Sequence, residues 1–355
     1  MFSRLLFPAE LPTWALALEL GLAAVIVILS GARLTRLADR LAEEYELGRA
    51  WVGMLLLATV TSLPEVVTAC TSVAIGAPDL AFATILGSCS FNIALIVWFN
   101  IAVGGGSILS GRNPVHVLTG TRGIFMIALT LAGIALSQKF QADPRIAGGC
   151  EIAVCLMIVF TYLQAIRTTY RLEQAAVPRP PSAAPVARTP GLLGRIVGSS
   201  LMLVAAAWWS ARTGDVLSSH PIGLLGRPLG ATFVGAAFLA VSTSLPEIVT
   251  GLAAVRMGQM DLALGNIFGS NMFNIFVVPM CKATSLAGGH PLLMAGAGFH
   301  PDPNLLAGLL PVLLTAVAIG GLTAGPRGRI LGLGADSVAI AFFYVGGMIL
   351  LLAGA

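Results

Sequence analysis

The chain has 355 residues, of which 57% are hydrophobic and only 10% are charged, and its mean hydropathy is +0.90. This apolar content exceeds what a soluble domain can bury while keeping a wettable surface, so it excludes an ordinary soluble protein and indicates a chain that crosses a membrane several times. The net charge of +4 comes from basic residues scattered among short loops, which predicts no nucleic-acid partner.

Ten apolar stretches follow one another along the chain, most of them close to the 20 or so residues that cross a hydrocarbon core of about 30 Å. We expect a transmembrane helix in each, near residues 13–31, 51–75, 80–103, 117–136, 147–166, 192–211, 229–255, 262–286, 305–324 and 335–354. The first stretch is expected to be a retained helix, because Pro8 and Glu10 precede it and no small-residue cleavage site follows before Arg33.

A segment rich in Pro and Ala, residues 171–191, separates the fifth stretch from the sixth. Its composition and lack of amphipathic periodicity predict a disordered linker. We therefore expect an all-α polytopic membrane protein in two five-helix halves, residues 1–170 and 192–355.

Basic residues are divided unequally between the two sides of this arrangement. Fourteen of the 20 lie beside the loops that follow odd-numbered helices, and six lie on the other side. Because cytoplasmic loops carry an excess of Lys and Arg, we expect the linker in the cytoplasm and both termini outside.

One stretch of sequence occurs twice. Residues 58–97 and 240–279 align without a gap and are identical at 19 of 40 positions. Because five crossings separate the two copies, they enter the membrane from opposite faces. Such inverted repeats place substrate sites near the midplane, where the two halves meet.

Each copy carries a glutamate inside an apolar helix. By residue count, Glu65 and Glu247 lie about 16 Å from the ends of their helices, and Asn92 and Asn274 lie about 20 Å from the starts of the next ones. Four helices can therefore bring these side chains to one level, near the middle of a membrane of about 30 Å. Carboxylates at that depth are costly and mark functional sites.

Oxygen donors surround both glutamates. Hydroxyl groups come from Thr61, Ser62 and Ser88 in the first copy and from Thr243, Ser244 and Ser270 in the second. An all-oxygen set with two carboxylates suits Ca²⁺, and smaller subsets suit Na⁺. The same carboxylates could alternatively carry protons. For the small residues Gly87 and Gly269 we expect only a role in close helix packing.

The motif TSLPE followed by GSxxFN, in two inverted copies of a ten-helix chain, resembles the sodium/calcium exchanger branch of the calcium/cation antiporter superfamily. The resemblance implies an antiporter, not an enzyme, that exchanges Ca²⁺ for Na⁺ by alternating access, with the first and sixth helices sliding across the other eight. The transported ions would be its only ligands, with no cofactor. H⁺-coupled exchange on the same carboxylates is the alternative.

The resemblance also implies the ligand set. Glu65 and Glu247 would be the central ligands, joined by Thr61, Ser62, Ser88, Asn92, Thr243, Ser244, Ser270 and Asn274, and by backbone carbonyl groups near Ala58 and Ala240. The short linker leaves no room for the calcium-sensing domains of animal exchangers, which indicates a prokaryotic plasma (inner) membrane protein. We expect a monomer surrounded by lipid.

This sequence departs from the family pattern at three positions. Asn274 replaces an acidic residue found in several members, and Thr84 and Cys89 replace Asn residues that the second copy keeps as Asn266 and Asn271. With two carboxylates, either one Ca²⁺ or two Na⁺ would neutralise the site, so the family's ion stoichiometry does not transfer directly.

Two functions of other classes compete with transport by exchange. An intramembrane hydrolase would need a nucleophile with a base, or a pair of His ligands, and neither repeat contains His. A passive cation channel is disfavoured because Pro-broken, inverted helices are typical of alternating access.

Charged residues outside the repeat centre are expected to be structural. Asp79 and Asp261 open the second helix of each copy, where Asp typically caps the helix. Glu151 and Lys282 fall near predicted helix ends and are expected to extend toward the interface.

Overall fold

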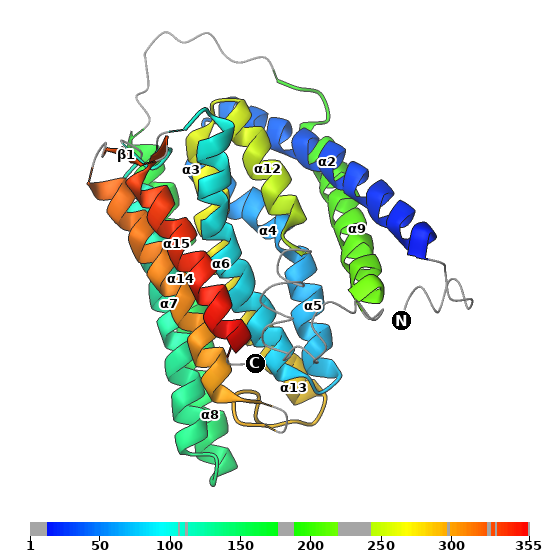
Figure 1. The fold of residues 1–355 in the computed structure, drawn as a ribbon, viewed down its shortest axis with the longest axis vertical. Coiled ribbons are helices and arrows are strands. Elements are labelled where there is room, and N and C mark those ends of the chain that lie inside the picture. Colours follow the sequence, from blue (N-terminus) through cyan, green and yellow to red (C-terminus); the bar gives the residue numbers. More distant parts are fainter. Residues whose placement is uncertain are drawn as a thin grey trace.

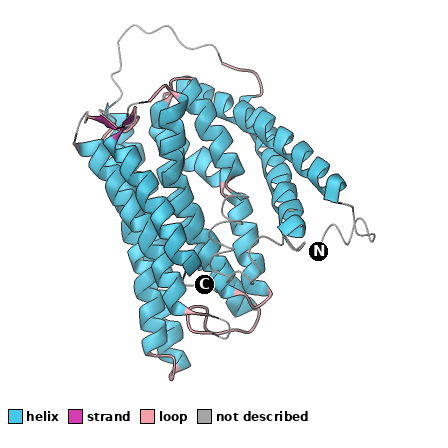
Figure 2. Ribbon diagram, in the orientation of Figure 1, coloured by secondary structure: helices cyan, strands magenta, loops and turns pink. Residues whose placement is uncertain are grey.

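In the computed structural model, the described residues are 13–105, 107–110, 113–176, 188–218, 243–296, 299–324, 328–330 and 332–353. Over these ranges the chain is a bundle of long helices with one small pair of strands (Figures 1 and 2). Eight of the described helices are long and apolar enough to span a membrane, and a bent pair brings the count to nine. The predicted all-α polytopic fold is therefore confirmed.

The first half contains the helices α2 (Thr13–Glu44), α3 (Arg49–Val52), the π-helix η1 (Gly53–Leu57), α4 (Ala58–Thr61), α5 (Leu63–Ala74), α6 (Pro78–Ala102), α7 (Val115–Lys139) and α8 (Pro144–Ala176). The segment from α3 to α5 forms the bent pair, with an angle of 45°. It corresponds to the second predicted span.

Helix α8 continues beyond its predicted end and includes the first six residues assigned to the linker. Glu173 explains the extension, because its buried carboxylate accepts hydrogen bonds from the Ala50 backbone N–H, at 3.1 Å, and from the Asn113 side chain. Residues 177–187 of the predicted linker lie outside the described part of the chain.

The second half contains α9 (Leu192–Ser218), α12 (Leu245–Arg256), α13 (Met260–Ala287), α14 (Pro301–Thr323) and α15 (Ala335–Ala353), with a two-stranded antiparallel hairpin of β1 (Arg329–Ile330) and β2 (Leu333–Gly334). The predicted seventh span, residues 229–255, is described only from residue 243 onward, so the count of ten helices stays a prediction.

Helices α6 and α13 form the centre of the molecule. In each of them 89% of the apolar window is buried, against half or less in every other described span. Both are lined with small residues, and α13 packs so closely on α3 and η1 that a Cβ atom added at Gly265 would lie 2.4 Å from the Ala50 carbonyl oxygen. The same holds at Gly269, the residue predicted to serve close packing, where a Cβ atom would lie 2.5 Å from the Met54 Cα.

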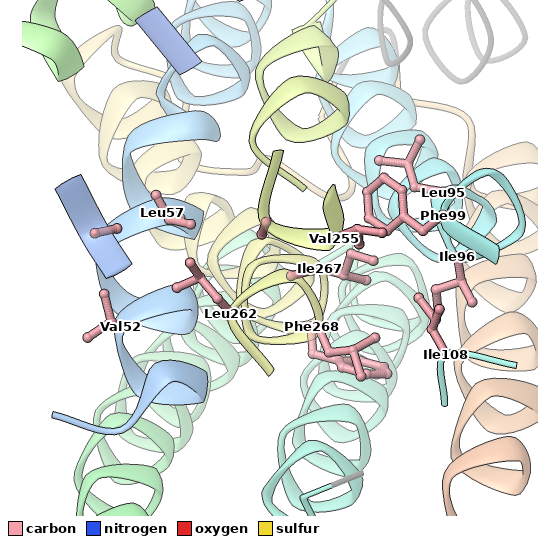
Figure 3. Close-up of a cluster of buried hydrophobic side chains, with 14 of the residues drawn as sticks. Val52, Leu57, Leu95, Ile96, Phe99, Ile108, Val255, Leu262, Ile267 and Phe268 are labelled. Atoms are coloured by element: carbon pink, nitrogen blue, oxygen red, sulfur yellow. The ribbon is translucent and has the colours of Figure 1, made fainter. Parts of the chain in front are cut away.

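An apolar cluster surrounds this contact. Figure 3 shows side chains from η1, α6, α12 and α13 that interdigitate, including Leu57, Phe99, Val255 and Phe268. Helices α5 and α12 leave the middle of the molecule in opposite directions, one toward each end of the bundle (Figure 1). The two Pro-Glu sequences at their starts are thereby brought to the same level.

Candidate ion-binding site

Each Pro-Glu sequence follows a break in its helix. Ser62, between α4 and α5, has φ −89° and ψ 8°, and Ser244, before α12, has φ −86° and ψ 12°. Pro64 and Pro246 then occupy the first turn of the next helix, where a residue without an N–H is tolerated. The sequence therefore places a helix N-terminus, and its positive dipole end, beside each glutamate.

The two glutamates exchange serine partners between the halves. Ser62 of the first copy donates a hydrogen bond to Glu247 Oε1 at 2.8 Å, and Ser244 of the second copy donates to Glu65 Oε1 at 3.1 Å. Both carboxylates are buried, with exposed fractions of 0% and 1%. Neither half can build this arrangement alone.

The following helix of each copy supplies a second serine. Ser88 on α6 donates to Glu65 Oε1 at 3.4 Å, and Ser270 on α13 donates to Glu247 Oε1 at 3.5 Å. Ser244 also lies 3.4 Å from Ser88, hydroxyl to hydroxyl. One oxygen atom of each carboxylate is thus held by a serine from each half.

Several buried oxygen atoms here have no hydrogen-bond partner among the described residues. They are Glu65 Oε2, Glu247 Oε2, Asn92 Oδ1 and Asn274 Oδ1, and the Asn274 amide nitrogen is likewise without a partner. An unpaired buried polar atom is costly, which points to a ligand. Two carboxylate and two amide oxygens form a donor set suited to a hard cation.

The positions where the two copies differ are connected to each other. Asn271 donates to the Cys89 carbonyl oxygen at 3.0 Å, and Asn92 donates its amide N–H to Asn271 Oδ1 at 3.1 Å. Among the described residues, Asn274 of the second copy makes no such contact with another amide. The difference between Cys89 and Asn271 therefore gives Asn92 and Asn274 different hydrogen-bond environments. The sequence showed that these two positions differ between the copies but not which side chains they contact.

Asn266 connects threonines of both halves. Its amide donates to Thr250 Oγ1 at 3.1 Å, and its Oδ1 accepts from Thr61 at 3.5 Å. In the first copy Thr84 stands in its place and donates to the Leu80 carbonyl of its own helix at 2.7 Å. Sequence reasoning singled out Asn266 only as a departure between the copies and did not foresee Thr250.

Three further ligands were expected at Thr243, Ala58 and Ala240. Thr243 is buried beside the break before α12. The Ala58 carbonyl oxygen accepts from Ser62 N at 3.1 Å and from Thr61 Oγ1 at 3.4 Å, so protein donors already occupy it. Ala240 lies outside the described residues.

Asp79 and Asp261 connect their helices to the other half, and neither is the N-cap residue of its own helix. Asp79 is the second residue of α6, whose N-cap is Ala77. Its Oδ1 accepts from the His300 backbone N–H at 2.8 Å and from the Asn304 amide at 2.7 Å, at the start of α14. Asp261 Oδ1 lies 2.9 Å from His116 Nε2 on α7. In both copies this Asp binds the start of a helix from the other half.

The expectation that Glu151 and Lys282 extend toward the interface is wrong. Both side chains are buried and lie 2.6 Å apart, Nζ to Oε2. Glu151 also accepts from Ser137 at 2.7 Å and from the Met294 backbone N–H at 2.8 Å. The pair joins α8 and α13 to the loop before α14. Each buried charge is tolerated there because it is fully paired.

A family profile described as sodium/calcium exchanger protein matches residues 15–170 and 191–352, which is most of the chain. The chain belongs to the sodium/calcium exchanger family. Family membership makes it a multi-pass membrane transporter of cations, and the recognition made from the TSLPE and GSxxFN motifs is confirmed.

Individual relatives are moderately similar to this chain. The chain is 28% identical over 307 residues to the candidate antiporter CaxA of Alkalimonas amylolytica, covering 84% of this chain and 88% of that protein. It is 49% identical to the sodium/calcium exchanger MaX1 of Methanosarcina acetivorans, but over 55 residues only, 16% of this chain and 15% of that one.

A solved structure of the sodium-calcium exchanger NCX_Mj, soaked with Na⁺ and Sr²⁺, superposes on the present chain with a TM-score of 0.65. The match covers 95% of this chain and 99% of that one at 16% identity. At this identity the likeness shows the fold alone.

Proposed function

We propose that the protein exchanges Ca²⁺ for Na⁺ across the membrane by alternating access, with both ions competing for one centre between Glu65 and Glu247. The observation that carries the proposal is the exchange of serine partners between the two glutamates. Because each half holds the other's carboxylate, an ion at this centre contacts both repeats at once and can bias the position of the helices that pack against them. Ion binding and conformational change are then coupled, as antiport requires.

The proposed ligands are the side chains that surround this centre. They are Glu65 and Glu247, Asn92 and Asn274, Thr61, Ser62 and Ser88, and Thr243, Ser244 and Ser270, with the backbone at Ala58 and Ala240. The four oxygen atoms without partners among the described residues are the strongest candidates within this set. The carbonyl oxygen of Ala58 would have to release a donor before it could bind an ion.

Access to this centre requires a conformational change, because both glutamates are buried. We propose that α2 and α9 slide as a pair against the other helices. They pack against each other at one side of the bundle (Figure 1), and α2 reaches the second repeat through Thr35, whose hydroxyl lies 3.3 Å from the Thr250 carbonyl oxygen. That contact is a direct link from the sliding pair to the glutamate helix.

We further propose that the membrane is the plasma (inner) membrane, with both termini outside and the 171–191 segment in the cytoplasm. The excess of basic residues on one side supports this orientation.

Ion flux in proteoliposomes tests the function. An outward-directed Na⁺ gradient from loaded vesicles should drive uptake of ⁴⁵Ca²⁺, and Glu65→Gln or Glu247→Gln should reduce it to background. Each change removes one of the two charges that balance Ca²⁺ but keeps the side chain's shape. Glu46→Gln, at an exposed turn, is the matched control and should leave exchange unchanged.

Undiminished exchange in both glutamate variants would overturn the site. Uptake driven by a pH gradient in the absence of Na⁺ would replace Na⁺ with H⁺ as the coupling ion. Uptake that needs no counter-ion at all would indicate a channel.

A further inference from the structure

A basic pocket lies between α2 and α9 and contains none of the ion-site residues. It has a volume of about 450 Å³ and is lined by Arg33, Arg36, Leu37, Arg40, Thr189 and Arg195. The three α2 arginines follow one another at intervals of three and four residues, so they share one face of the helix. Arg195, in the first turn of α9, faces them.

Most of this positive charge is not neutralised. Arg40 pairs with Glu43 at 3.3 Å, but Arg33, Arg36 and Arg195 have no ion-pair partner among the described residues. The neighbouring linker cannot supply one, because residues 177–187 contain no Asp or Glu. Glu44 lies near the pocket, where its Oε1 accepts from the Thr189 backbone N–H at 2.9 Å, but it forms no ion pair with these three arginines. Three clustered guanidinium groups with no ion pair among the described residues are an electrostatic site for an anion, and Arg binds phosphate groups well because its donors form a planar fork.

A second pocket of about 500 Å³ continues from the first, since both are lined by Arg33 and Arg195. It runs away from the arginines between the two helices, over Gly191, Gly194 and Gly198, to Leu29 and Met202. Ser30 and Ser199 also line it. No atom lies within 4 Å of a Cβ built at Gly194 or Gly198, so the glycines form the open floor of a mainly apolar groove.

The exposed surface changes character where the two pockets meet. On α2 the exposed residues Leu22, Val25, Ile28 and Leu29 are apolar, and the next exposed ones are Arg33 and Arg36. This is the change expected at the boundary between hydrocarbon and headgroups. The basic pocket thus lies at headgroup depth and the groove at the depth of the acyl chains.

We propose that this composite pocket binds an anionic phospholipid, with the phosphate among Arg33, Arg36 and Arg195 and an acyl chain along the glycine floor of α9. A basic pocket between transmembrane helices is the feature that recognises such headgroups. A soluble phosphate would use the arginines but would leave the apolar groove empty. The site shares no residue with the ion centre and does not depend on the proposed exchange.

Native mass spectrometry of the purified full chain, with phosphatidylglycerol and phosphatidylcholine of the same chain length, tests the site. We expect phosphatidylglycerol to bind at least tenfold more tightly. The double variant Arg33→Gln/Arg195→Gln should lower that affinity by roughly tenfold or more, since each Arg near an anionic headgroup contributes about a few-fold. Arg256→Gln, an exposed arginine at the end of α12, is the matched control and should have no effect.

Gly198→Leu separates a lipid from a soluble anion. The added side chain enters open space, so it should fill the groove without disturbing the arginines. We expect it to weaken phosphatidylglycerol binding several-fold. Equal binding of both lipids, an unchanged affinity in the arginine variant, or displacement of the lipid by millimolar glycerol 3-phosphate would overturn the proposal.

Discussion

The serine hydroxyl groups that cross between the halves determine the geometry of the candidate site at the scale of single residues. Ser62 and Ser244 sit at helix breaks, where backbone dihedral angles outside the helical range turn each side chain toward the glutamate of the other copy. A hydrogen bond to a charged group contributes about 1.5–3 kcal/mol, so these two bonds contribute much of the free energy that holds the glutamates in place.

Removing either serine hydroxyl should weaken ion binding by a similar factor. For Ser62→Ala and Ser244→Ala we expect roughly a tenfold rise in the Kd for Ca²⁺, because the freed carboxylate oxygen loses the donor that orients it. Isothermal titration calorimetry in detergent measures this. Ser90→Ala is the control, since Ser90 is also buried on α6 but donates to the Leu86 carbonyl. An equal loss of Ca²⁺ affinity in Ser90→Ala would show that Ser62 and Ser244 have no specific role.

Asn274 should determine whether exchange carries net charge. With two carboxylates, one Ca²⁺ or two Na⁺ balances the site, so the protein should exchange without generating a current. Asn274→Asp adds a third negative charge in a position where neither amide atom has a hydrogen-bond partner among the described residues. We expect a third Na⁺ to be accommodated and the rate of Ca²⁺ uptake to become dependent on a K⁺/valinomycin potential.

The equivalent change in the first copy provides the contrast. Asn92 donates its amide N–H to Asn271 Oδ1. In Asn92→Asp that bond is lost, and a carboxylate oxygen then faces the Asn271 oxygen, so two acceptors lie opposite each other. We expect lower Ca²⁺ affinity from it and no gain of charge coupling. Identical behaviour of the two variants would contradict the asymmetry described here.

Helix contacts determine where these residues can meet, and α13 approaches α3 and η1 closely. Gly53 and Gly265 let the two backbones approach, with a Cβ added at Gly53 lying 2.4 Å from the Leu262 carbonyl oxygen. Because the opposing atoms belong to the backbone, they cannot rotate away.

Alanine at Gly265 should therefore destabilise the protein although alanine favours helices. We expect Gly265→Ala to cost about 1–3 kcal/mol through overpacking, measured as a fall in the unfolding temperature in detergent. Gly149→Ala in α8 is the control, because no atom lies within 4 Å of the added Cβ, and its helix should be unchanged or slightly more stable. Equal melting temperatures in the two variants would refute the close approach.

The buried pair of Glu151 and Lys282 stabilises the end of the bundle where α8, α13 and the loop before α14 meet. Lys282→Met leaves the Glu151 charge without its partner, and breaking such a pair costs about 3–5 kcal/mol. The double variant Glu151→Gln/Lys282→Met should recover much of this loss. A double-mutant cycle on thermal unfolding measures the coupling, and additive losses would show that the two side chains act independently.

At the scale of the whole molecule, the two halves are interdependent. Each supplies a serine to the other's glutamate, and each carries an Asp that binds the start of a helix from the other half. The contacts are reciprocal, which is the arrangement expected of inverted repeats that work as a unit.

The proposed orientation predicts which loops a reagent can reach. A cysteine introduced at Ser182, in the segment between the halves, should react with a membrane-impermeant maleimide only after cells are opened. A cysteine at Ala142, in the turn between α7 and α8, should react in intact cells. The parent chain, with its five native cysteines, gives the background labelling. The reverse labelling pattern would show that the topology is the opposite of the proposed one.

The sequence by itself determined the class of fold and the position of most spans, and it predicted the oxygen-donor chemistry of the candidate site. Hydrophobic length gives the spans directly because each helix must satisfy its own backbone in lipid, and carboxylates repeated inside such spans stand out from that background. The family followed from the same motif. Most predicted spans agree with the observed helices to within a few residues, except where α2, α8 and α9 extend further.

Only the tertiary structure decided which side chains face one another. Nothing in the sequence says that Ser62 binds Glu247 instead of Glu65, because that choice depends on how the halves interlock. Nor could helix ends reveal that Lys282 is buried against Glu151, or that Asp79 binds the start of α14 instead of capping its own helix. Local patterns predict elements because their backbone bonds are local, whereas polar pairing across the bundle is fixed only when distant helices meet.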